Sequence, residues 1–105
     1  MPQFDVFQNA NLETNEVFPL LVDVQAELLG NLRTRAVIPL TKAVELTGYP
    51  MSYLTPRVTF EDQSYLLMTP QIAGISRAEL GPYVGSLANH ESVISSAIDF
   101  LIRGF

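Results

Sequence analysis

The chain has 105 residues, with eleven Asp and Glu against six Lys and Arg, a net charge of −5 and no cysteine. This length suits a single domain over residues 1–105, which can bury a core without disulfides or a structural metal. The lack of cysteine excludes disulfides, thiolate nucleophiles and Cys-based zinc sites, and an acidic chain with scattered cations argues against charge-driven binding to nucleic acid.

The first half of the chain has the alternation that is typical of β-strands. Residues 4–7 predict a first strand, in which Phe4 and Val6 alternate with Asp5 and Phe7, and residues 17–25 predict a second. In the second strand a period of two places Leu20, Val22 and Val24 on one face. The polar residues 9–16 between the two strands predict a loop. Residues 35–40 predict a further strand, whose Pro39 indicates an edge strand or a strand end because proline has no N–H to pair.

The next part of the chain predicts turns and short strands. Residues 41–50 predict a structured loop, since Gly48 and Pro50 stop a short helical pattern. Residues 57–68 predict a β-hairpin with a polar turn at 61–63. Residues 69–86 are rich in Pro and Gly and favour further short strands.

The last segment changes to helical spacing and predicts an amphipathic helix from about Asn89. Asn89 is a candidate N-cap, and Gly104 lies where a left-handed residue ends a helix. The residues that recur every three or four positions are Val93, Ile94, Ala97, Ile98, Leu101 and Ile102. Several short strands with one terminal helix predict an α+β domain built on a strongly bent antiparallel sheet or small barrel.

The sequence offers few candidates for catalysis. His90 is the only histidine, which excludes a two-histidine metal site, and its position near the helix start favours a capping or surface role over that of a general base. The adjacent Glu61 and Asp62 favour a solvated turn, and residues 81–85 lack the lysine and spacing of a phosphate loop. We therefore expect no catalytic residue, no cofactor and no metal site.

Two arginines leave an alternative open. Arg33 and Arg35 form either a small anion-binding patch or ion pairs with carboxylates such as Asp23 or Glu27.

Two apolar features stand where polar residues are usual. Leu28 and Leu29 follow a predicted strand, and either tuck under the sheet or form a surface patch. The chain ends with Ile102-Arg103-Gly104-Phe105, where Phe105 either folds back onto the helix or stays available to a partner. No uncharged stretch reaches the ~18 apolar residues of a membrane span, and residues 1–5 do not resemble a secretory signal, so we expect a cytoplasmic protein.

The chain resembles the CcdB family of toxins from plasmid and chromosomal toxin–antitoxin modules. The resemblance runs from Gln3 to Phe105 and is carried by Leu21-Val22-Asp23-Val24-Gln25, Val37-Ile38-Pro39-Leu40, Met68-Thr69 and the terminal helix that ends at Gly104. It implies an SH3-like barrel with a C-terminal helix, a homodimer, and a toxin that is not an enzyme but binds the A subunit of DNA gyrase and traps the complex of gyrase with cleaved DNA.

The resemblance also implies partners and contact residues. The gyrase contacts fall on Leu28, Leu29, Asp99, Ile102, Arg103, Gly104 and Phe105. A cognate antitoxin is expected to fold a disordered segment over the toxin. Residues 8–16 and 42–53 match the family poorly and are the expected variable surfaces. Some family members carry tryptophan at the position of Arg103, and Phe105 is expected to restore the aromatic contact.

Two other functions remain open from the sequence. Endoribonuclease toxins use the same small barrel, and a ribonuclease would need cations such as Arg33, Arg35 and Arg57 beside a carboxylate. A relic that only binds its antitoxin is the third possibility.

Overall fold

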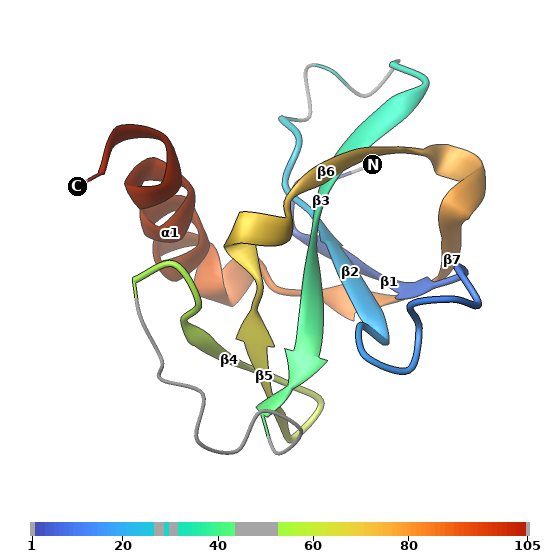
Figure 1. Ribbon diagram of the computed structural model, residues 1–105, viewed down its shortest axis with the longest axis horizontal. Coiled ribbons are helices and arrows are strands. Elements are labelled where there is room, and N and C mark those ends of the chain that lie inside the picture. Colours follow the sequence, from blue (N-terminus) through green and yellow to red (C-terminus); the bar gives the residue numbers. More distant parts are fainter. Residues whose placement is uncertain (1, 27–28, 30–31, 44–52, 105) are drawn as a thin grey trace.

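The computed structural model describes residues 2–26, 29, 32–43 and 53–104. Seven antiparallel strands form one curled sheet in the order β4-β5-β3-β2-β1-β7, and β6 pairs with the first half of β3. Figure 1 shows the helix α1 to one side of this sheet. The elements are β1 (Asp5–Asn9), β2 (Leu20–Asp23), β3 (Thr34–Lys42), β4 (Arg57–Phe60), β5 (Gln63–Leu67), β6 (Ala73–Ser76), β7 (Leu80–Ser86) and α1 (Glu91–Arg103). The predicted α+β class is confirmed.

The core lies between the concave face of the sheet and α1. Leu20, Val22 and Val24 are all in this cluster, as their alternation predicts. From α1, the buried Ile94 and Ala97 pack into the same cluster. Their spacing of three residues places both side chains on one face of the helix, so the opposite face of α1 is left to solvent.

Pro39 lies inside a central strand, so the predicted edge position is wrong. β3 pairs with β2 along one side, and on its other side its partner changes from β6 to β5 at Pro39. The Pro39 carbonyl accepts a hydrogen bond from the Met68 N–H at 2.9 Å, while the Met68 carbonyl accepts from the Gln71 N–H at 2.9 Å. In a regular antiparallel ladder the Met68 carbonyl would accept from the N–H of residue 39, which proline lacks. The bond from Gln71 satisfies this carbonyl instead.

The predicted hairpin is confirmed and has a tight turn. Glu61 and Asp62 connect β4 to β5 with φ of 50° and 64°. Two successive positive φ values match the twist of a β-hairpin, although they are unfavourable for residues other than glycine and asparagine. Across the core, Gly85 of β7 has φ of 155°, and a Cβ there would lie 2.7 Å from a ring carbon of Phe60.

Two predicted boundaries are wrong. The strand expected over 17–25 begins only at Leu20, because the N–H groups of Val17 and Phe18 donate to the Thr14 carbonyl in a turn. Asn89 is not the N-cap, since a short 3-10 turn over Ala88–His90 precedes α1.

The loop between β1 and β2 is organised by the side chain of Asn9. Its amide nitrogen donates to the Thr14 hydroxyl and to the Phe18 carbonyl, and its amide oxygen accepts from the Asn11 N–H. In the part of the chain that the structure describes, the helices are too short and too polar to cross a membrane.

Candidate functional site

The C-terminal end of α1 presents an exposed surface. Gly104 adopts the left-handed conformation with φ of 79°, and its N–H donates to the Phe100 carbonyl at 2.9 Å, so the predicted helix end is confirmed. Ile102 is 73% exposed in the last turn. Asp99, Arg103 and Gly104 are also exposed. The positive charge of Arg103 complements the negative end of the helix dipole.

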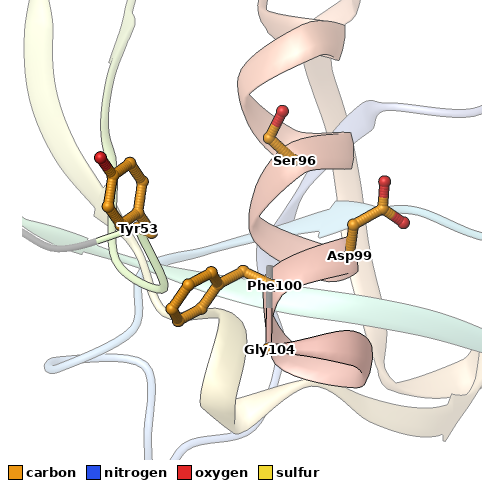
Figure 2. Close-up of a pocket in the computed structure, with 5 residues that line it drawn as sticks. All are labelled: Tyr53, Ser96, Asp99, Phe100 and Gly104. Carbon is orange, nitrogen blue, oxygen red and sulfur yellow. The ribbon is translucent and has the colours of Figure 1, made fainter.

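A hollow of about 410 Å³ lies beside this helix end and is lined by Tyr53, Ser96, Asp99, Phe100 and Gly104. Figure 2 shows the ring of Tyr53, from the segment before β4, facing the ring of Phe100. The ring centroids are 5.5 Å apart and the rings are tilted by 33°. The hollow therefore has an aromatic wall and a carboxylate at its rim.

The sequence names Tyr53 only as the end of the expected variable region 42–53, and it does not single out Phe100. Helical spacing places Phe100 one turn before Gly104, so the sequence pattern is sufficient to predict that Phe100 lies near the helix end. Tyr53 is 47 residues from Phe100 along the chain, and no local pattern predicts that contact.

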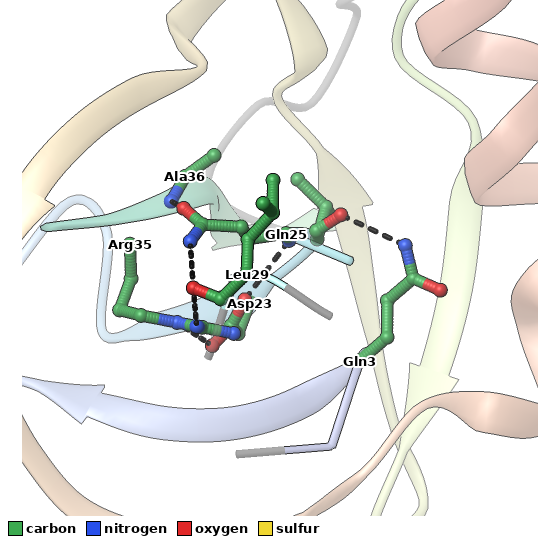
Figure 3. A network of polar contacts seen from close by, with 7 residues as sticks. Gln3, Asp23, Gln25, Leu29, Arg35 and Ala36 are labelled. Atoms are coloured by element: carbon green, nitrogen blue, oxygen red, sulfur yellow. Dashed lines mark hydrogen bonds and ion pairs between the residues drawn. The ribbon is translucent and has the colours of Figure 1, made fainter. Parts of the chain in front are cut away.

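Leu29 is the second exposed apolar feature, and the residue is 49% exposed. It therefore does not tuck fully under the sheet. Its backbone carbonyl accepts hydrogen bonds from Gln25 Nε2 at 2.9 Å and from Arg35 Nη1 at 3.4 Å. Gln25 Oε1 accepts from the Ala36 N–H at 3.0 Å, so one side chain joins the Leu29 backbone to β3 (Figure 3).

Arg35 and Asp23 form a fully buried ion pair beneath this segment. Arg35 Nε lies 2.7 Å from Asp23 Oδ2, and neither side chain has solvent-exposed surface. Asp23 Oδ1 also accepts from the Gln25 N–H at 2.9 Å. The expected alternative of an ion pair with Asp23 is confirmed for Arg35, and the anion-binding patch with Arg33 is wrong because Arg35 does not reach the surface.

The expected contact residues fall into two groups that lie apart within one chain. Figure 1 shows the end of α1 at the left of the view and the chain that leaves β2 at the top of the view. Leu28 and Phe105 lie outside the described residues. The structure thus brings Asp99, Ile102, Arg103 and Gly104 together on one helix end and places Leu29 elsewhere.

The other candidates for chemistry have structural positions. Glu61 and Asp62 form the exposed hairpin turn, and residues 81–85 lie within β7. His90 directly precedes α1, and its side chain makes no capping hydrogen bond. Among the described residues, no three His, Cys, Asp or Glu side chains gather as ligands for a metal ion.

The curled antiparallel sheet with one C-terminal helix places the chain in the class of small α+β domains. The family model described as CcdB protein matches residues 3–104 of the 105. The chain belongs to the CcdB family, the toxins of toxin–antitoxin modules, whose partners in general are an antitoxin and gyrase.

Proposed function

We propose that this chain is a cytoplasmic toxin that binds the A subunit of DNA gyrase as a homodimer and traps the complex of gyrase with cleaved DNA. A cognate antitoxin with a disordered segment would neutralise it. The proposed contact residues are Leu28, Leu29, Asp99, Ile102, Arg103, Gly104 and Phe105. The proposal rests on membership of the family and on the surface at the end of α1.

The exposure of Ile102 is the observation that carries the proposal. A large aliphatic residue that is 73% exposed gains little stability from folding, whereas burying it fully against a partner contributes about 1.5–3 kcal/mol. The left-handed Gly104 ends the helix directly after Arg103, which keeps the last turn available. The half-exposed Leu29 offers a second apolar contact of the same kind.

Two separate groups of contact residues are compatible with a homodimer that binds one partner. A homodimer presents two helix ends and two Leu29 segments, so groups that lie apart in one chain can meet the partner from two chains. A protein of this kind needs no catalytic residue, because gyrase itself cuts the DNA. It needs only to bind the open, DNA-cleaved conformation of gyrase more tightly than the closed one, which shifts the population toward the open state.

Arg103 is the point at which specificity toward gyrase is expected to differ from that of family members with tryptophan. A guanidinium keeps a flat stacking surface but adds a positive charge. We propose that Phe105 supplies the aromatic contact in its place. Unchanged affinity for gyrase A in both Arg103→Ala and Phe105→Ala would remove these two residues from the site.

The test of function adds the purified chain to gyrase with supercoiled DNA and, in parallel, to a long RNA. Accumulation of cleaved complex supports the proposal, RNA fragments would establish a ribonuclease, and neither activity would indicate an antitoxin-binding relic. The burial of Arg35 in its ion pair removes one of the three cations that a ribonuclease would need.

The contact surface is tested with a matched pair of exposed aliphatic residues. Ile102→Ala is expected to weaken binding to gyrase A about tenfold, since truncating a central contact typically costs more than ~1 kcal/mol. Leu12→Ala, in the loop between β1 and β2, is the control because Leu12 is also highly exposed and lies outside the proposed surface. Equal effects of the two variants would refute the assignment of Ile102.

A further inference from the structure

The backbone of Leu29 is held by side chains that do not belong to the proposed contact surface. Its carbonyl accepts from Gln25 Nε2 at 2.9 Å, from Arg35 Nη1 at 3.4 Å and from the Leu32 N–H at 3.1 Å. The Leu29 N–H in turn donates to the Ala26 carbonyl at 3.0 Å. The orientation of the Leu29 backbone is therefore restrained by Ala26 and Leu32 and, through Gln25 and Arg35, by β3.

Gln25 is the link between this position and the sheet. Its Oε1 accepts from the Ala36 N–H of β3 at 3.0 Å, and its own backbone N–H donates to Asp23 Oδ1 at 2.9 Å. Figure 3 shows the Gln25 side chain extending from the end of β2 between Ala36 and Leu29. Both ends of the amide are therefore used, which fixes its orientation as well as its position.

We propose that Gln25 is a positioning residue that, together with the buried pair of Arg35 and Asp23, sets the placement of Leu29 for contact with gyrase. This inference rests on the proposed function. An exposed leucine contributes to binding only to the extent that its backbone is already placed, because ordering a mobile segment on binding costs free energy. Gln25 itself does not touch the partner.

The exposure of Leu29 explains why hydrogen bonds, and not packing alone, hold its backbone. Leu29 is half exposed, so packing beneath its side chain supplies only part of the restraint. A hydrogen-bonded amide anchored on β3 restrains the backbone and leaves the apolar surface available to a partner.

The variant that tests the proposal is Gln25→Glu. Glutamate keeps the oxygen that accepts from the Ala36 N–H but replaces the donor to the Leu29 carbonyl with a second acceptor. We expect about tenfold weaker binding to gyrase A, the loss expected when a hydrogen bond is replaced by repulsion between two acceptors. Gln8→Glu in β1 is the matched control, because Gln8 is exposed. This substitution makes the same change from amide to carboxylate at a position away from Leu29.

A double-mutant cycle separates positioning from general destabilisation. In a Leu29→Ala background, Gln25→Glu is expected to change affinity less than about twofold, because the contact that it positions has been removed. Nuclear magnetic resonance gives an independent signature: the carbonyl ¹³C resonance of Leu29 is expected to shift in Gln25→Glu and not in Gln8→Glu. If Gln25→Glu does not fold, Gln25→Asn takes its place, since an amide one methylene shorter cannot bond both partners.

The outcomes distinguish this inference from the proposed function. A wild-type chain that does not bind gyrase A would refute both. Wild-type binding that is weakened by Leu29→Ala and unchanged by Gln25→Glu would refute the positioning role alone. A loss in Gln25→Glu that is equally large in the Leu29→Ala background would also refute it, since the effect would then not pass through Leu29.

Discussion

The buried pair of Arg35 and Asp23 makes the sharpest prediction about stability. Both side chains are fully buried and their charged atoms are 2.7 Å apart. Asp23→Ala removes the ion pair and the acceptor of the Gln25 N–H, and it leaves a guanidinium in the interior with only the Leu29 carbonyl at 3.4 Å among the bonds described. Arg35→Ala leaves a buried carboxylate that still accepts from the Gln25 N–H.

The expected cost follows from that burial. Removing one partner of a buried ion pair typically costs about 3–5 kcal/mol, because the remaining charge stays desolvated without compensation. The total stability of a domain is about 5–15 kcal/mol, so each single variant is expected to lose a large share of it. For a domain of this size, such a loss lowers the melting temperature by roughly 15–30 °C.

The measurement is unfolding by urea and by heat at one fixed protein concentration, because the proposed homodimer makes the midpoint depend on concentration. The double variant Asp23→Leu/Arg35→Met, which removes both charges, is expected to lose less than the sum of the two single variants. Single-variant losses below ~1 kcal/mol, the range of a solvent-exposed pair, would refute the conclusion that this pair is desolvated.

Three further predictions concern other parts of the sheet. Gly85→Ala is expected to cost about 1–3 kcal/mol in urea unfolding, since its Cβ meets the phenyl ring of β4 at a strained φ, whereas Gly74→Ala, with no atom within 4 Å of its Cβ, stays within ~0.5 kcal/mol. Replacing Glu61 and Asp62 by Asn-Gly is expected to raise stability by about 0.5–1 kcal/mol because both positions have positive φ, and a lower urea midpoint would contradict this. Burial, and to a lesser extent the charge of Glu61, raises the pKa of Tyr65 above 10.0, so the stabilisation from its protonated form is present below pH 10 and is lost as the pH rises through the folded-state pKa. Tyr65→Phe should therefore flatten the alkaline fall in stability, and an unchanged pH profile would show that Tyr65 does not cause it.

The sequence by itself determined the elements whose signals are local. The hairpin of β4 and β5 follows from alternating residues around a polar turn, and α1 follows from apolar residues every three or four positions. Gly104 was predicted as the helix end because a left-handed residue is required there. These features depend on backbone periodicity and on the conformations that single residues allow, so short stretches of sequence are enough to predict them.

Only the tertiary structure decided which segments meet. Pro39 lies in a central strand because two different partners share one side of β3, which no local pattern reveals. Arg35 is buried in an ion pair with Asp23, twelve residues earlier on the neighbouring strand β2, and Tyr53 meets Phe100 from a segment far away in the chain. The partner of a polar group depends on how distant segments pair, so the sequence named both options for Arg35 and the fold chose between them.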